Sequence, residues 1–104
     1  MKKLSTCGSA VAEAIGAFQD VQTHGALSAE NVKGMYPGDG GRLEGEDRAQ
    51  WEKDRKDIDF VVKSYATPIA WRARGRVYKV KQKFSSTTSH HQGKLYLLKE
   101  SEDA

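Results

Sequence analysis

The sequence has little of what stabilises or anchors many small proteins. Cys7 is its one cysteine, so no disulfide can form within the chain and no zinc site can be built from several cysteines. No hydrophobic run approaches the roughly 18 residues that a membrane-spanning helix needs. The N-terminal stretch lacks the apolar core of a signal peptide, because Glu13 interrupts it. These absences predict a soluble, cytoplasmic protein with no membrane partner.

Acidic residues are absent from one long segment. Residues 60 to 99 contain nine lysines and arginines and no aspartate or glutamate. The residues before and after this segment carry net negative charge, so the formal net charge of the whole chain is only +3. One contiguous segment therefore holds all of the excess positive charge, which is typical of a region that meets an anionic partner.

Hydrophobic residues are also scarce, at 38% of the 104 residues. A chain of this length forms one core, so we expect a single domain over residues 1 to 104. A composition with so few apolar residues also predicts a flexible segment. Six glycines and a proline place this segment at residues 23 to 45, where Ser28 caps at most one helical turn. An acidic tail occupies residues 99 to 104.

Two segments have the composition of helices. After a potential N-cap at Ser9, apolar residues recur at helical spacing, which predicts an amphipathic helix over residues 10 to 22. Residues 46 to 57 combine strong helix formers with acids in the first turn, which the helix dipole favours. Trp51 is the one large apolar residue of this second, acidic helix. We expect that helix to lie mostly in solvent and to dock through Trp51.

The C-terminal half alternates apolar and polar side chains, as strands do. Alternation runs over residues 58 to 65, 69 to 71 and 77 to 84. Gly75 marks the reversal of a hairpin, and Gly93 another reversal before a last strand over residues 94 to 98. The predicted fold is α+β, with an antiparallel sheet of three or four strands packed by the first helix. Ile69 and Trp71 are expected on the apolar face that this helix covers.

Two stretches of this half carry a recognisable motif. SYATPIAW occupies residues 64 to 71, and FSSTTSHHQ occupies residues 84 to 92. The pair S-Y-x-T-P-I-A-W and [YF]-S-x-T-T-S-x-H-Q resembles a family of short uncharacterised proteins that actinobacterial phages and mobile elements encode. The resemblance implies a phage or mobile-element context and a β-hairpin that carries the motif. It implies no activity.

The hydroxyl run Ser85 to Ser89 stands directly before His90 and His91. A hydrolase would need a serine, a histidine and a carboxylate in contact, and residues 60 to 99 contain no acid. A metal ion would need both histidines on one side, whereas neighbours on a strand point to opposite faces. We therefore favour a polar strand whose hydroxyls bond to a neighbouring strand, and we expect no enzyme activity, cofactor or metal.

Basic and aromatic side chains gather around the predicted hairpin. Lys79, Lys81 and Lys83 would share one face of a strand at intervals of about 6.6 to 6.8 Å, close to the spacing of successive phosphates. Lysines on an edge strand also prevent aggregation, which is the structural alternative. The residues that we expect to contact a partner or a nucleic acid are Arg72, Arg74, Arg76, Lys79, Lys81, Lys83, Tyr65 and Trp51.

Two functions from different classes fit these features. The favoured one is a small non-enzymatic phage or mobile-element effector that binds and inhibits a host protein, for example a nucleic-acid-processing or CRISPR-type defence complex. The alternative is direct nucleic-acid binding through the basic hairpin, with Tyr65, Trp71 and Tyr78 as stacking faces. The acids that would imitate a nucleic-acid backbone in the first hypothesis are Glu44, Glu46, Asp47, Glu52, Asp54, Asp57 and Asp59. The sequence does not determine the oligomeric state.

Overall fold

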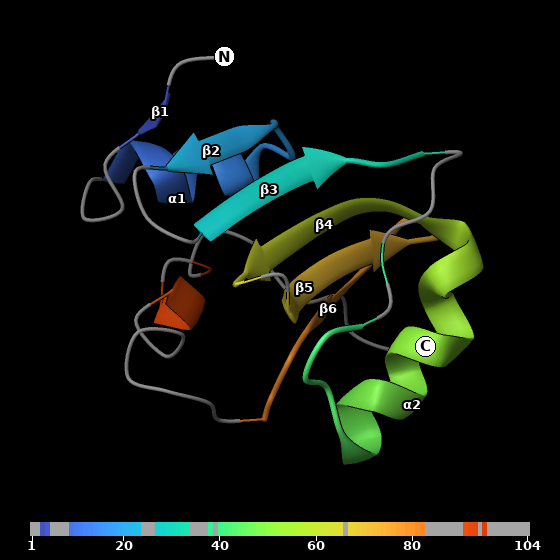
Figure 1. Cartoon of the computed structure of the whole chain (residues 1–104). Helices are drawn as coiled ribbons and strands as arrows, with labels where there is room; N and C mark the ends of the chain where they lie inside the picture. Colours follow the sequence, from blue (N-terminus) through green and yellow to red (C-terminus); the bar gives the residue numbers. More distant parts are fainter. Residues whose placement is uncertain are drawn as a thin grey trace.

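A single sheet organises the chain, whose computed structural model describes residues 3–4, 9–23, 27–33, 38, 40–65, 67–82, 91–93 and 95. Six strands lie in the order in which they occur in the sequence (Figure 1). They are β1 (Lys3–Leu4), β2 (Val21–Thr23), β3 (Leu27–Asn31), β4 (Ile58–Ser64), β5 (Thr67–Ala73) and β6 (Arg76–Lys79). β1 pairs parallel with β2, and the other neighbours pair antiparallel. The predicted α+β class is confirmed, with more strands than the three or four expected.

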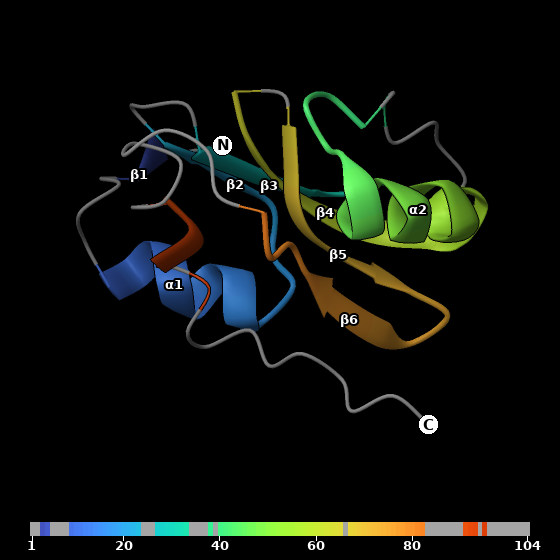
Figure 2. The same cartoon turned by 90° about the horizontal axis from the view of Figure 1, so that it is seen from below.

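The two helices cover opposite faces of the sheet. Figure 2 shows α1 (Ser9–Gly16) on one side and α2 (Gly45–Asp54) on the other, and a short 3-10 turn, η1 (Arg55–Asp57), follows α2. The α1-side core contains Val11, Ile15, Leu27, Phe60, Val62 and Ile69, and the α2-side core contains Val32, Leu43, Trp51, Val61, Trp71 and Val80. Trp51 is fully buried, so docking of α2 through this side chain is confirmed.

A bulge in β5 decides which helix its side chains meet. The pairing of β4 with β5 shifts register between Val62 and Lys63, which leaves Ile69 as an extra residue in β5. Ile69 and Ala70 therefore both join the α1-side core, and Trp71 joins the α2-side core. The prediction that Ile69 and Trp71 share one face is wrong, because a bulge interrupts the alternation on which it depended.

α1 ends at Gly16, before the predicted end at residue 22. The backbone amides of Phe18 and Gln19 donate hydrogen bonds back to the carbonyls of Ile15 and Ala14, each at 3.0 Å. Phe18 has φ +57°, so this is the left-handed C-terminal cap that glycine usually provides. The Phe18 ring packs edge-on against Phe60, with ring centroids 5.3 Å apart. Packing of this ring thus favours phenylalanine over glycine at the cap position. No helix-stop signal in the sequence indicates this end.

The composition predicted one flexible loop over residues 23 to 45, but part of this segment forms a strand. Leu27–Asn31 forms β3, between β2 and β4, so the helical turn expected after Ser28 is wrong. Leu27 and Ala29 are buried in the α1-side core, and Ser28 between them lies on the opposite face. Alanine, glutamate and asparagine are depleted in strands, so pairing on both sides overrides a weak local preference here.

Asp20 fastens the start of β2 to the end of β3. Its Oδ1 accepts hydrogen bonds from the backbone N–H and the side-chain amide of Asn31, both at 2.8 Å. These hydrogen bonds hold the pKa of Asp20 below its ordinary value of 3.8, and the bond from the backbone N–H has the larger effect.

The charged Asp20 carboxylate should therefore stabilise the fold at neutral pH. This contribution should be lost in acid, where Asp20 becomes protonated. A group with a lowered pKa in the folded state adds stability above its unfolded pKa, and this contribution disappears as the pH falls through the folded pKa. We expect Asp20→Ala to lower the urea midpoint at neutral pH and to match the wild type more closely below about pH 3. Glu30→Gln, on the neighbouring strand, is the control, and an equal gap for Asp20→Ala at both pH values would contradict the assignment.

The C-terminal predictions are confirmed for the strand that starts at Ile58 and for the hairpin after it. Arg74 and Gly75 have φ +54° and +75°, as a tight two-residue reversal between β5 and β6 requires. His91 to Gly93 and Leu95 are helical, so the strand predicted over residues 94 to 98 is wrong at Leu95. The hydroxyl run, Lys83 and the acidic tail lie outside the described residues. Within the described parts of the chain, no helix has the length and apolar character needed to cross a membrane.

Candidate functional site

The two halves of the sequence motif meet at a buried hydrogen bond. Ser64 Oγ, at the end of β4, lies 2.7 Å from His91 Nδ1. Both residues are almost completely buried, with 1% and 2% of their surfaces exposed. The ring of His91 also lies beside that of Tyr65, with centroids 6.2 Å apart. The motif residues Ser64, Tyr65 and His91 therefore form one contiguous cluster at the β4–β5 turn.

Other motif residues tie neighbouring segments to this turn. Thr67 Oγ1 accepts a hydrogen bond of 3.2 Å from the backbone N–H of Arg42, in the segment before α2. The side-chain amide of Gln92 donates to the carbonyls of Val80 and Gln82, each at 3.2 Å. These contacts join segments that are distant in the sequence, so the motif encodes a structural junction.

Loss of the buried pair should destabilise the fold modestly. Ser64→Ala removes the hydrogen bond to His91 Nδ1 from a site without solvent, and we expect the free energy of unfolding to fall by about 1 to 2 kcal/mol. Urea denaturation at neutral pH measures the change. Ser28→Ala, at a half-buried serine on the opposite face, should change it by less than about 0.5 kcal/mol. Equal effects of the two substitutions would contradict a specific role for the Ser64–His91 bond.

The cluster does not resemble a hydrolytic site. A nucleophilic serine must reach its substrate, whereas the Ser64 side chain lies in the interior. Among the described residues, no group of three or more histidine, cysteine, aspartate or glutamate side chains could hold a metal ion. Ser64 and His91 are therefore structural residues in this arrangement, whatever the hydroxyl run outside the described residues does.

Two of the predicted partner-binding cations pair with acids of their own chain. Arg72 Nε donates to Asp59 Oδ1 at 2.8 Å, in a half-buried ion pair. Arg74 forms ion pairs with Asp57, at 2.5 Å, and with Asp54. Its hydrogen bond to Asp57, and then that to Asp54, raise the pKa of Arg74. Acids from α2, η1 and the start of β4 thus pair with the two guanidinium groups that were expected to face another molecule.

Lys79 and Lys81 of the predicted basic face do not lie on one strand. β6 ends at Lys79, before Lys81. Beyond it, the ammonium group of Lys81 lies over the ring of Tyr78, 4.7 Å from its centroid. Lys81 is therefore on the Tyr78 side, opposite to the prediction, because the chain leaves the sheet at this point. Arg76 is exposed at the hairpin.

The two aromatic residues of the predicted site have opposite environments. Trp51 is fully buried under α2 and cannot reach a partner in this fold. Tyr65 is 61% exposed, and among the described residues it is the one large hydrophobic side chain that is exposed. It has φ +54° at the β4–β5 turn, and its ring lies beside the buried His91. The β4–β5 turn thus presents an aromatic ring to solvent.

Tyr65 lies at the end of a polar strip on the α2 side of the sheet. By alternation along β4, Lys63 points to the same face as the buried Val61, and Tyr65 follows in the turn just beyond the strand. Ser28 pairs with Lys63 in the register of the sheet, and Gln22 pairs with Ser28. Gln22, Ser28, Lys63 and Tyr65 form what we call the Tyr65 surface.

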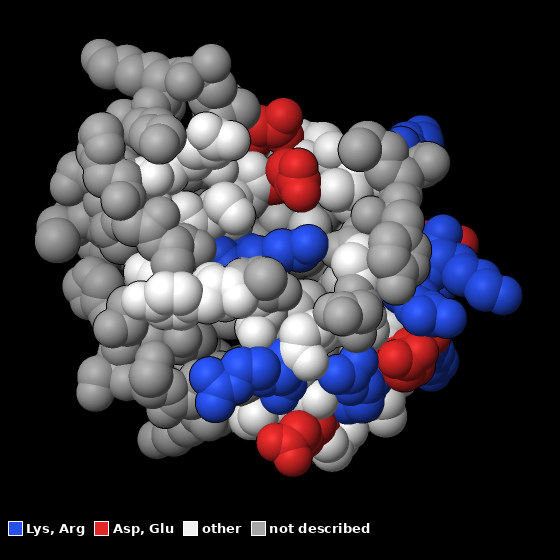
Figure 3. Space-filling view, viewed as in Figure 1, with Lys and Arg blue, Asp and Glu red and all other residues white. Residues whose placement is uncertain are grey.

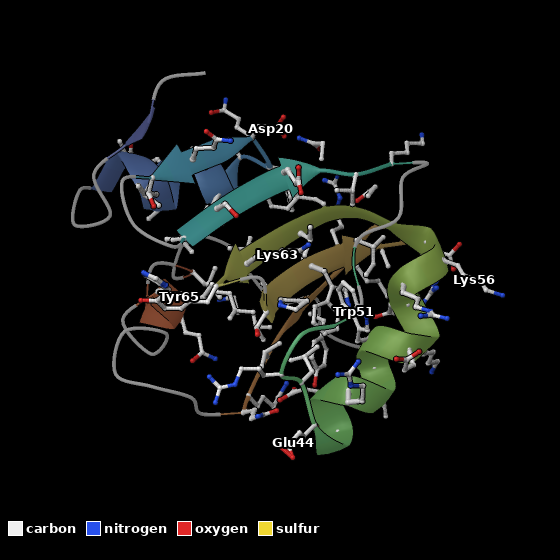
Figure 4. All side chains as sticks on the ribbon, in the orientation of Figure 1. Asp20, Glu44, Trp51, Lys56, Lys63 and Tyr65 are labelled. Atoms are coloured by element: carbon white, nitrogen blue, oxygen red, sulfur yellow. The ribbon has the colours of Figure 1, made fainter. Side chains whose placement is uncertain are left out.

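α2 leaves this part of the sheet uncovered. Figure 4 shows Lys63 and Tyr65 on the other side of Trp51 from α2, and Figure 3, in the same orientation, shows a basic side chain at the centre of this face. The backbone of Arg42 lies beside the surface, through its bond to Thr67. Lys63 and Arg42 make no ion pair with any described residue, unlike Arg72 and Arg74. Tyr65 was predicted from the sequence, whereas the strip beside it depends on β3, which was missed.

Comparison with known proteins assigns a family. The model of a group described as "Family of unknown function (DUF8033)" matches residues 4–103, almost the entire chain. The chain belongs to this family. It matches no curated protein and no solved structure. Strands β2 to β6 and the Tyr65 surface fall within the DUF8033 match, whose description names no activity.

Proposed function

We propose that the protein is a non-enzymatic binding protein that docks onto a protein partner through the Tyr65 surface. In keeping with the motif in residues 64 to 71 and 84 to 92, the partner is a host protein in the cytoplasm that a phage or mobile-element product inhibits. Defence and nucleic-acid-processing complexes are the leading partner class. The single observation that carries the proposal is the exposed ring of Tyr65 at the β4–β5 turn.

An exposed tyrosine in this position has the properties of an interface anchor. Tyrosine is enriched among residues that dominate binding energy, since it buries a large area and fixes few rotatable bonds. The turn that carries Tyr65 is held from behind by the buried Ser64–His91 bond, so little order remains to be gained on binding. Polar side chains of the same strip, the half-buried Lys63 and the exposed Gln22 two strands away, match the polar rim that surrounds such anchors.

The revised docking surface replaces the one expected from α2. Trp51 is buried, and Asp47, Asp54, Asp57 and Asp59 bond to groups of their own chain. Acids held in this way do not imitate the regular, solvent-facing charges of a nucleic-acid backbone. A partner therefore meets Tyr65 and its neighbours, and α2 supports the sheet from the other end of the same face.

Capture from a host extract tests this proposal. The tagged full-length chain is the bait, with and without nuclease, beside Tyr65→Ala and the control Lys56→Ala, whose side chain is exposed on η1. We expect the wild type and Lys56→Ala to retain the same host protein after nuclease, and Tyr65→Ala to retain at least about tenfold less. Equal retention by Tyr65→Ala, or loss of all capture after nuclease, would refute docking through this ring.

Direct nucleic-acid binding through the hairpin is the alternative function. Comparing capture with and without nuclease tests it. Its support is reduced because Arg72 and Arg74 are paired internally, and because Trp71 and Tyr78 stack on each other with centroids 5.0 Å apart. Trp71 is buried, so it offers no face to a base. Nuclease-sensitive capture that Tyr65→Ala leaves unchanged would favour this alternative.

A further inference from the structure

The cations beside the Tyr65 surface identify the chemistry of its partner. Most described arginines of the α2 side and the hairpin are neutralised within the chain: Arg48 and Arg55 pair with Glu52, Arg72 with Asp59, and Arg74 with Asp54 and Asp57. Lys63 stands two residues before the exposed tyrosine, the Arg42 backbone bonds to Thr67 just after the turn, and neither cation pairs with any of the described acids. Their charge is available to a second molecule.

The segment before α2 brings these two cations to the same turn. The Arg42 backbone bonds to Thr67, which pairs with Ser64 across the β4–β5 ladder. Gly38, in the same segment, approaches the Lys63 ammonium so closely that a Cβ there would lie 3.0 Å from it. One cation precedes Tyr65 by two residues along β4, and the other flanks the turn that Tyr65 occupies.

We infer that the Tyr65 surface binds an acidic segment of a protein, whose carboxylates meet Lys63 and Arg42 while an apolar side chain covers the Tyr65 ring. This inference rests on the proposed function and specifies its partner. Glu30, exposed on β3 and paired in register with Val61, bounds the cationic strip and repels acids beyond it.

An acidic protein fits this surface better than a single-stranded nucleic acid does. Binders of single strands present several aromatic faces to successive bases. In the described parts of the chain, Tyr65 is the one exposed large aromatic ring, because Trp51 and Trp71 are buried. The His91 ring lies beside Tyr65, so one face of that single platform is also partly covered. One anchor with flanking cations suits a peptide segment that carries one apolar group among carboxylates.

Titration of the isotope-labelled full chain at low salt tests the inference. The probes are a poly-glutamate peptide and an oligothymidine of equal charge, and the readout is the shift of backbone amide signals. We expect poly-glutamate to shift the signals of Ser28, Lys63 and Tyr65 more than those of the hairpin residues. The double variant Lys63→Glu/Arg42→Glu should bind poly-glutamate at least about tenfold more weakly than the wild type.

A matched control separates local from overall charge. Lys53→Glu/Lys56→Glu changes the net charge equally, at exposed positions on α2 and η1, and should stay within about twofold of the wild type. Equal weakening of both double variants, or tighter binding of oligothymidine than of poly-glutamate at the same residues, would overturn the inference.

Failure of this inference can be told apart from failure of the proposed function. If Tyr65→Ala abolishes capture of a host protein while Lys63→Glu/Arg42→Glu does not, a protein partner stands and its acidic character is wrong. If neither variant affects capture, the docking surface itself is wrong.

Discussion

Trp71→Ala is expected to remove a large part of the stability of this protein. The Trp71 side chain is 1% exposed and lies at the centre of the α2-side core. Its ring stacks on Tyr78 and meets the edge of Trp51, with both centroid distances 5.0 Å. Truncation of a buried tryptophan costs about 3 to 5 kcal/mol, and small domains have about 5 to 15 kcal/mol in total. Urea denaturation followed by circular dichroism measures the loss.

The indole of Trp71 also satisfies a buried acid. Trp71 Nε1 donates to Asp54 Oδ2 at 2.9 Å, and Asp54 is 5% exposed. Trp71→Phe keeps an aromatic ring and removes this donor, so it should cost about 1 to 3 kcal/mol. Tyr65→Ala, at an exposed ring, should cost less than about 0.5 kcal/mol and shows that the function variant is folded. A loss in Trp71→Ala no larger than that in Tyr65→Ala would contradict the central position of Trp71.

The class of the fold could be predicted because it depends on local patterns. Helical spacing after Ser9, alternation from Ile58 and a glycine at the hairpin each act over a few residues, and each corresponds to an observed element. β3 was missed because its residues have weak strand preference and are held by pairing with β2 and β4. Tertiary contacts of this kind leave little trace in a single sequence.

The site was predicted in part for the same reason. Tyr65 lies in a motif and is exposed, as expected of a contact residue. Arg72 and Arg74 were expected to face outward, since nothing in residues 60 to 99 could neutralise them. Their partners, Asp59 and Asp57, come from just before that segment and reach the hairpin only because β4 and β5 pair. Counting charges along the sequence cannot reveal ion pairs that form only when two strands pair.

α2 shows how buried acids were overlooked. Asp47, Trp51 and Asp54 lie at helical spacing on one face, and all three are buried. The sequence analysis counted only Trp51 as a docking residue, because aspartate is seldom buried unless it is paired. Both aspartates are paired with groups from the sheet side: Asp54 with Trp71 and Arg74, and Asp47 with the chain just after β6. The acidic helix is therefore amphipathic, with acids inside its buried stripe.

Asp47→Ala is the second substitution with a large expected effect, because one carboxylate holds three donors. Asp47 accepts hydrogen bonds from the Tyr78 hydroxyl at 2.6 Å, from the Lys81 backbone N–H at 3.1 Å and from the Gln82 backbone N–H at 2.7 Å. It is 4% exposed. Hydrogen bonds to a charged group contribute more than neutral ones, so we expect a loss of about 2 to 4 kcal/mol.

The effect should spread to the chain that follows β6. The Gln82 side chain bonds to the backbone of Glu44 and Arg42, and Gln92 bonds to the Gln82 carbonyl, so release of residues 80 to 82 loosens both contacts. In Asp47→Ala, amide hydrogen exchange should accelerate more at Lys81 and Gln82 than at the residues of β4. Glu46→Ala, an exposed neighbour in the same helical turn, is the matched control and should leave both readouts within about 0.5 kcal/mol of the wild type. If the two variants behave alike, Asp47 does not anchor the end of β6, and Trp51 and Asp54 hold α2 on the sheet without it.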